Sequence, residues 1–240
     1  MEKVLIHIED LTVAYNDKPV LWDNDLDIIK NSRTAIIGPN GAGKSTLIKA
    51  ILDIQKRISG KIYIEGKTFK EVKKDIAYIP QINSVNWDFP ITVIDVVLMG
   101  RYVHLGWIKR PTKEDRILAE KALEKIGLLE FKERQISELS GGQKQRVFIA
   151  RAIAQDAQIY FMDEPLAGVD KVTEKIIIDF LKELQKKGKT SIVVHHNLNT
   201  IPDYFDHVIM LNKKVVASGK VEDVFTKENL EKTFGGGRDE

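Results

Sequence analysis

The chain has 240 residues, no cysteine and a formal net charge of +2, from 37 basic and 35 acidic residues. This length suits one large domain with room for a subdomain, and the charge balance does not favour a nucleic-acid partner. The lack of cysteine excludes disulfides and thiol catalysis, and no apolar run reaches the roughly 18 residues that span a bilayer.

The first part of the chain alternates short β-like runs with turns. Runs of apolar and β-branched residues between turn-forming residues are typical of strands. The predicted strands are Val4–Ile8, Leu11–Ala14, Val20–Ile28, Thr34–Ile37 and Lys61–Ile64. Ile76–Ile79 follows as another buried strand and ends at Pro80, which cannot continue a hydrogen-bonded ladder.

The segment from Gly38 to Ser45 matches the phosphate-loop pattern G-x-x-x-x-G-K-[ST] at every fixed position. It lies between a predicted strand and a predicted helix, so that successive backbone N–H groups face one point at the helix N-terminus and can bind an anion. Lys44 is expected to reach the β- and γ-phosphates, and the Ser45 hydroxyl to ligate Mg²⁺. We therefore predict a nucleoside triphosphate site. Its residues are Gly38, Pro39, Asn40, Gly41, Ala42, Gly43, Lys44, Ser45 and Thr46.

The pattern changes to helical from Thr92 to about Ala154. Pro111-Thr112 is a helix start signal, and the periodicity of the helix that follows predicts one apolar face. The residues assigned to that face are Ile117, Leu118, Leu123 and Ile126.

Strands return in the last third of the chain. Ile159–Met162 and Thr190–Val194 are separated by a predicted helix, Val172–Lys187, which Gly188 would terminate as a C-cap. A final hairpin is predicted from two further strands. These are His207–Leu211 and Val215–Ala217. The organisation is an α/β nucleotide-binding core interrupted by a helical insertion.

Two carboxylates, Asp163 and Glu164, follow directly after the apolar strand Ile159–Met162. Open α/β sheets bind ligands at the carboxyl ends of their strands. Asp163 is therefore expected to hold Mg²⁺, usually through water, and Glu164 to polarise a water for attack on the γ-phosphate.

A second glycine-containing turn, Leu139-Ser140-Gly141-Gly142-Gln143, precedes a helix predicted over Lys144–Ala154. Such a turn exposes N–H groups that could contact another phosphate. An N-cap serine followed by an ordinary glycine turn is the simpler interpretation.

The phosphate loop, the turn at Leu139–Gln143 followed by Gln145-Arg146, and the Asp163-Glu164 pair, in this order, resemble the ATPase subunit of ABC transporters. The resemblance covers essentially the whole chain. It implies a single ABC-type ATP-binding domain over 1–240, with an α/β P-loop NTPase core at about 1–90 and 155–240. It further implies a mixed sheet, an N-terminal antiparallel β subdomain, and a helical subdomain inserted at about 91–154.

The resemblance implies roles for further residues. Tyr15 would stack on adenine, although a tyrosine packed on its own sheet is the alternative. Gln81 would sense Mg²⁺ and link the core to the helical subdomain, and Asp170 would couple two active sites across a dimer. The residues of the second turn that would contact ATP are Ser140, Gly141, Gly142 and Gln143.

His195 and His196 compete for the role of a histidine that contacts the γ-phosphate. Neighbours on a strand point to opposite faces, so both cannot do so if the strand continues through them. His196 is chosen because it precedes Asn197-Leu198, where the family usually has Asp-Leu. A metal site at the histidine pair would need a third ligand, which the sequence does not place nearby.

In the family that the chain resembles, two subunits pair head to tail and enclose two ATP molecules. Ser140, Gly142 and Gln143 would then serve the ATP of the partner copy. Hydrolysis would drive an integral-membrane permease, so the chain is expected in the cytoplasm, peripheral on the inner face of the cell membrane.

The segments Pro80–Arg101, Pro165–Asp170 and His196–Asp206 resemble the ATPases of bacterial zinc, manganese and iron importers. These importers use a separate metal-binding receptor outside the cell, so that receptor is an expected indirect partner. Three aromatic residues of the helical region could meet a permease helix or fill the core of the subdomain. They are Trp87, Phe89 and Trp107.

Two other functions remain open at this point. A soluble ABC-type ATPase without a transport role, for example in Fe–S cluster assembly, shares the same motifs. A nucleotide-binding switch that does not hydrolyse ATP is the other, but Glu164 argues against it because such proteins commonly lose this carboxylate.

Overall fold

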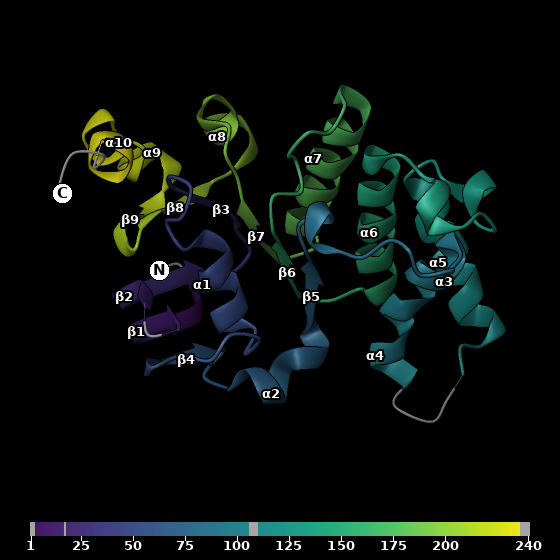
Figure 1. Ribbon diagram of the computed structural model, residues 1–240, viewed down its shortest axis with the longest axis horizontal. Coiled ribbons are helices and arrows are strands. Elements are labelled where there is room, and N and C mark those ends of the chain that lie inside the picture. The colour runs from purple at the N-terminus through teal and green to yellow at the C-terminus, as the bar shows by residue number, and fades with distance from the viewer. Residues whose placement is uncertain (1–2, 17, 106–109, 236–240) are drawn as a thin grey trace. The chain divides into compact units, whose positions relative to one another are not determined.

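The computed structural model describes residues 3–16, 18–105 and 110–235, and the chain divides into two compact units (Figure 1). The first unit comprises Met1–Lys73 and Leu184–Glu240, and the second comprises Lys74–Glu183. Trp107 lies outside the described residues. Along the described parts of the chain, no helix combines the length and the apolar character needed to cross a membrane.

The first unit contains a three-stranded antiparallel sheet in the order β2-β1-β4. Its strands are β1 (Val4–Tyr15), β2 (Lys18–Ile29) and β4 (Ser59–Ile64). Two predicted runs, Val4–Ile8 and Leu11–Ala14, are parts of the single strand β1. Asp10, with φ of 49°, lies between them, and the β1–β2 register shifts between Ile8 and Leu11. A bulge therefore replaces the predicted turn.

The first unit also contains β3 (Arg33–Ile37), β7 (Thr190–Val194), β8 (His207–Asn212) and β9 (Lys214–Lys220). β3 lies between β7 and β8 and is parallel to both, whereas β8 and β9 form the predicted antiparallel hairpin. The helices of this unit are α1 (Lys44–Ile51), α2 (Phe69–Val72), α8 (Ile201–Tyr204), α9 (Val221–Val224) and α10 (Lys227–Phe234).

The second unit contains two parallel strands, β5 (Ile76–Ile79) and β6 (Ile159–Met162), and several helices. These helices are α3 (Val93–Leu98), α4 (Tyr102–Leu105), α5 (Lys113–Lys125) and α6 (Gly141–Gln155). α7 (Lys171–Lys186) begins in this unit and ends in the first. Together with the sheets of the first unit, these elements make the α/β fold that the sequence predicts.

The buried face of α5 differs from the prediction. Leu123 and Ile126 are buried, but Ile117 and Leu118 are 51% and 37% exposed. Asp115, Ala119 and Ala122 complete the buried face, at helical spacing from Leu123. The pattern was misread because a charged residue and two alanines occupy the core-facing positions.

Gly188 ends α7 as predicted. It has a left-handed backbone with φ of 73°, and its N–H donates to the Gln185 carbonyl at 2.9 Å. The Lys189 N–H donates to the Leu184 carbonyl at 3.0 Å, so that two carbonyls of the last turn are satisfied.

The start of α5 is stabilised by a carboxylate network around Asp115. This carboxylate accepts hydrogen bonds from the Thr112 N–H at 2.9 Å, the Thr112 hydroxyl at 2.8 Å and Arg101 Nε at 3.0 Å. Arg101 also donates to the Ala154 carbonyl at 2.8 Å, which ties α5 to the end of α6. The Thr112 N–H, followed by Arg101, lowers the pKa of Asp115 to about 2.

We predict that Asp115→Asn destabilises the protein by about 1–2 kcal/mol at pH 7, measured by urea unfolding. The folded-state pKa lies below the unfolded value, so the stabilisation is present above about pH 4 and is lost as pH falls toward 2. The difference between variant and wild type should therefore shrink in acid. Glu114→Gln, at the exposed neighbouring position, should change stability little at either pH. A constant difference across this range would contradict the assignment.

Candidate nucleotide-binding site

The phosphate loop of the first unit runs from the end of β3 to the start of α1 at Lys44. Its three glycines have positive φ values, 156° at Gly38, 79° at Gly41 and 97° at Gly43. A Cβ at Gly38 would lie 1.9 Å from the Leu211 carbonyl oxygen, and one at Gly43 would lie 2.5 Å from Leu21 Cδ2. Glycine is required at Gly38, because a side chain would overlap a backbone oxygen, and it is favoured at Gly43, because the positive φ would strain any other residue.

The Lys44 side chain folds back over this loop. Its Nζ donates to the carbonyl oxygens of Gly38 at 2.9 Å and Pro39 at 2.8 Å, and the residue is buried. The first turn of α1 presents N–H groups that have no partner within the helix. A cation and a helix N-terminus at the same loop form an anion site, as the sequence predicts.

The turn between β8 and β9 supports the loop, which the sequence did not reveal. The Lys213 N–H donates to the Ala42 carbonyl at 3.0 Å, and the Lys213 carbonyl accepts from the Trp22 N–H at 3.0 Å. Lys213 itself has a left-handed backbone, with φ of 59°. The turn thus joins β2 to the middle of the phosphate loop.

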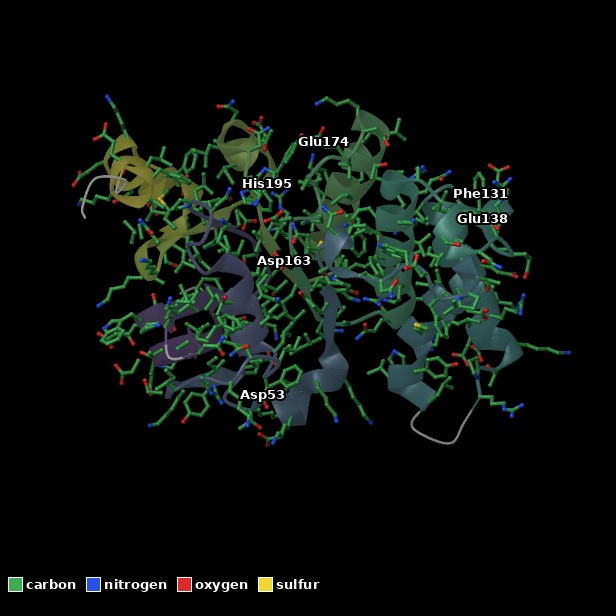
Figure 2. The ribbon with its side chains drawn as sticks, in the orientation of Figure 1. Asp53, Phe131, Glu138, Asp163, Glu174 and His195 are labelled. Atoms are coloured by element: carbon green, nitrogen blue, oxygen red, sulfur yellow. The ribbon has the colours of Figure 1, made fainter. Side chains whose placement is uncertain are left out.

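The remaining predicted residues of the first unit lie at strand ends. Tyr15 is the last residue of β1, pairs with Lys18 and is 41% exposed. His195, labelled in Figure 2, follows the end of β7, where its N–H donates to the Ile36 carbonyl at 3.0 Å. Its ring is buried against Phe205, with Nε2 2.7 Å from the Thr200 hydroxyl, whereas His196 is exposed. The role assigned to His196 stays a prediction.

In the second unit, Asp163, labelled in Figure 2, follows the end of β6 and is followed by Glu164. Asp163 is buried, and its N–H donates to the Ile79 carbonyl of β5 at 2.9 Å. The Glu164 carboxylate accepts a hydrogen bond from Gln81 Nε2 at 2.8 Å. The structure thus brings together Gln81 and Glu164, two of the predicted catalytic residues.

Tyr78 lies one residue before the end of β5, where the Asp163 carboxylate influences it. Burial, with a further contribution from the Asp163 charge, raises its pKa to about 12. The tyrosine therefore stays neutral at physiological pH and adds no charge beside Asp163.

Ser140 and the two glycines after it belong to α6, which begins at Gly141 rather than at the predicted Lys144. Ser140 is the N-cap, and its hydroxyl accepts from the Gln143 N–H at 3.3 Å. The Gln143 side chain accepts from the Ser140 N–H at 2.9 Å and completes a capping box. The low helix propensity of glycine had concealed this first turn, which presents N–H groups to solvent.

Asp170 lies against that first turn. Its carboxylate accepts hydrogen bonds from the Thr173 N–H at 2.9 Å and from the Thr173 hydroxyl at 3.0 Å, and so caps α7. These two hydrogen bonds lower the pKa of Asp170. A Cβ at Gly142 would lie 3.0 Å from Asp170 Oδ2. A side chain there would require the Asp170 carboxylate to shift by a few tenths of an ångström, and sequence reasoning did not foresee this contact within one chain.

Comparison with known proteins identifies the family. Residues 21–167 match the family model described as ABC transporter. The chain belongs to the ATP-binding subunits of ABC transporters. It is 53% identical over 231 residues to the zinc transport system ATP-binding protein TroB of Treponema pallidum (strain Nichols), covering 96% of this chain and 87% of that protein.

Two further similarities support this family. The chain is 54% identical over 231 residues to the manganese transport system ATP-binding protein MntB of Bacillus subtilis (strain 168), covering 96% of this chain and 92% of that protein. It also resembles the dimeric post-hydrolysis structure of the ATP-binding cassette MJ0796 bound to ADP and Pi. The TM-score is 0.79 at 28% identity, covering 90% of this chain and 99% of that one.

These matches confirm the predicted family, the α/β fold and the ATPase activity. The ABC transporter ATPase therefore binds ATP and works with a membrane permease. Both relatives are named as parts of transport systems, so a role in Fe–S cluster assembly is not favoured.

We predict that Gly38→Ala lowers the affinity of the ABC ATPase for a fluorescent ATP analogue by more than about tenfold, because the new methyl group displaces the loop from β8. Gly41→Ala is the matched control, since no atom lies within 4 Å of its added Cβ and only backbone strain opposes it. Gly41→Ala should therefore lose less affinity for the analogue than Gly38→Ala. Equal affinities for Gly38→Ala and wild type would show that the contact with Leu211 does not shape the site.

Proposed function

We propose that this ABC ATPase powers the import of a divalent first-row metal, zinc or manganese, through a separate permease. The observation that carries the proposal is its identity of 53–54% with relatives named for zinc and manganese transport, over nearly the whole chain. The described residues contain no group of three or more His, Asp or Glu side chains that could hold a metal ion. Selection of the cargo would therefore belong to the permease and an extracytoplasmic metal-binding receptor.

The roles of the site residues follow from their chemistry. Lys44 would neutralise the β- and γ-phosphates, and Tyr15 would stack on adenine. The hydroxyl of Ser45, the carboxylate of Asp163 and the amide oxygen of Gln81 are oxygen donors of the kind that Mg²⁺ prefers. Mg²⁺ would neutralise charge on the phosphates.

Glu164 would orient and polarise the attacking water, and His196 would contact the γ-phosphate. The hydrogen bond from Gln81 supports this assignment, since a neutral amide donor fixes the orientation of the Glu164 carboxylate without protonating it. Through this hydrogen bond, a movement of the segment that carries Gln81 would also move the carboxylate of the general base, Glu164.

We further propose a head-to-tail homodimer. The first turn of α6 carries N–H groups that have no partner within the helix, and the Asp170 carboxylate lies close to Gly142 in this turn. Ser140, Gly141, Gly142 and Gln143 would bind the ATP held by the phosphate loop of the partner copy. Asp170, which touches this turn, would couple the two sites.

A groove of about 240 Å³ in the second unit fits a docking site for the permease. Phe89 and Met99 line it and are 67% and 45% exposed, whereas Trp87 is packed on Phe148 with ring centroids 5.1 Å apart. Trp87 Nε1 also donates to the Ile82 carbonyl at 3.1 Å. Of the two described aromatic candidates, Phe89 rather than Trp87 is therefore available to a partner, and the ATPase would lie peripherally on the cytoplasmic face of the membrane.

The decisive experiment is reconstitution of the ATPase with the permease that co-purifies from its own host, followed by uptake assays with radioactive zinc and manganese. ATP-dependent uptake of either ion supports the proposal. Uptake of another cargo would remove the metal assignment, and recovery of partners without any permease would overturn the transport role of this chain.

We predict that Glu164→Gln reduces ATP turnover at least about 100-fold while leaving ATP binding intact, because the amide cannot polarise water but can still accept the Gln81 hydrogen bond. The variant should accumulate as an ATP-bound dimer in size-exclusion chromatography. Undiminished hydrolysis would exclude Glu164 from the mechanism.

A mixing experiment is the control for the head-to-tail arrangement. Ser140→Arg and Lys44→Ala subunits should each be inactive alone, but a mixed dimer retains one site with both elements intact. ATPase activity should therefore return on mixing. If Ser140 served the ATP of its own chain, no mixture would regain activity.

We predict that Phe89→Asp lowers the yield of co-purified permease by at least about tenfold, because a charge would be buried against an apolar partner surface. Ile117→Asp, at another exposed apolar position, is the matched control and should leave the yield unchanged. Basal ATPase activity of both variants verifies folding. Normal recovery with Phe89→Asp would place the docking site elsewhere.

A further inference from the structure

Residues of two edge strands of the first unit, β2 and β9, line a groove of about 620 Å³. Figure 1 labels both strands. β2 is the edge strand of the antiparallel sheet, and β9 is the edge strand beside β8. Edge strands carry backbone N–H and C=O groups that point away from their own sheet and can pair with another chain. The walls of the groove therefore present hydrogen-bonding groups from two sides.

Asn24, which precedes the groove residue Asp25 in β2, joins this strand to the start of β9. Its side-chain Nδ2 donates to the Lys213 carbonyl at 3.1 Å, and its Oδ1 accepts from the Val215 N–H at 2.6 Å. Asn24 is buried, so these bonds form away from water. The Asn24 side-chain amide thus hydrogen-bonds one carbonyl and one N–H group at the start of β9. A peptide bond of a neighbouring strand would supply the same donor and acceptor.

Beyond Asn24 the groove has an apolar floor and an acidic rim. The floor includes Leu26, Ile28, Val208 and Ile209, all buried. The rim carries the carboxylates Glu9, Asp25, Asp27 and Asp223 and the cations His7 and Lys220. Acidic groups thus outnumber basic ones.

Contacts of the rim offset only part of this negative charge, since Lys61 Nζ lies 4.0 Å from the Glu9 carboxylate. His7 is bound to Asp27 at 2.6 Å and to Glu9 at 2.9 Å, which raises its pKa. Asp25 accepts from the Asp10 N–H at 2.9 Å, a neutral donor that leaves its charge uncompensated. Asp223 is exposed on the opposite wall, in α9.

We propose that this groove binds an extended segment of a partner protein, which pairs its backbone with the edges of β2 and β9 and directs lysine or arginine side chains to the acidic rim. Asp25–Ile29 offers five residues of β2, about 17 Å of strand at roughly 3.3 Å per residue. Strand addition at an exposed edge is a common mode of peptide recognition. The negative rim disfavours nucleotides and other anions.

A second groove, of about 640 Å³, continues from the first and shares Ile29, His207 and Lys220 with it. Lys3 and Lys30 line this continuation together with Asp206 and Glu222, and Lys30 also pairs with Glu65. The continuation is therefore of mixed charge, and the excess of carboxylates is confined to the first groove.

The test uses the whole chain and two fluorescent five-residue probes, acetyl-Lys-Val-Lys-Val-Lys-amide and acetyl-Glu-Val-Glu-Val-Glu-amide. Binding is followed by anisotropy, and the bound region by hydrogen–deuterium exchange. The basic probe should bind at least about tenfold more tightly, weaken with added salt, and protect amides in residues 25–29 and 214–220. Nucleotide binding should not change, because no residue of the groove belongs to the phosphate loop.

The variant Asp27→Lys with Asp223→Lys reverses one charge on each wall and should abolish the preference for the basic probe. Glu130→Lys with Asp179→Lys makes the same charge change outside the groove and should retain it; ATPase activity checks that both variants fold. Protection elsewhere, equal affinity for both probes, or no binding at millimolar concentration would overturn the proposal. In that case the carboxylates only protect an edge strand from aggregation.

Discussion

The approach of the Leu211 carbonyl oxygen to the Cα of Gly38 is the contact on which the nucleotide site depends. It exists because β3 and β8 are parallel neighbours, so that the chain leaving β3 must turn past the end of β8. Only a residue without Cβ can make that turn. The loop that results points its N–H groups toward one place and lets Lys44 bond to its own carbonyls, which prepares the site before an anion arrives.

In the second unit the functional groups are also held in place in advance, but by hydrogen bonds of side chains rather than by a close backbone contact. The Gln81 amide orients the Glu164 carboxylate, the Ser140 and Gln143 pair caps α6, and Asp170 caps α7 beside Gly142. Each group satisfies a partner that would otherwise be an unpaired donor or acceptor. Preorganised donors lower the cost of orienting groups during the reaction, so these bonds serve the chemistry as well as the fold.

Much of this arrangement could be predicted from the sequence, because it is determined by local patterns. The strand before the phosphate loop, the apolar strand before Asp163 and the C-cap at Gly188 each depend on residues a few positions apart. Periodicity and turn chemistry report such features directly. The motifs also name the atoms required, since a phosphate loop needs glycines, a lysine and a hydroxyl in one order.

What the sequence did not show depends on contacts between distant residues or on positions where propensity misleads. Gln81 and Glu164 are 83 positions apart, and only the parallel pairing of β5 with β6 brings the ends of their strands together. The Lys213 turn reaches the phosphate loop for a similar reason, since β8 pairs with β3. The first turn of α6 was hidden because two glycines oppose helix formation, yet the capping box offsets that cost. Asp170 lies so close to Gly142 that a Cβ there would make a tight contact, so a position unfavourable for the helix is one where the packing around the site favours glycine.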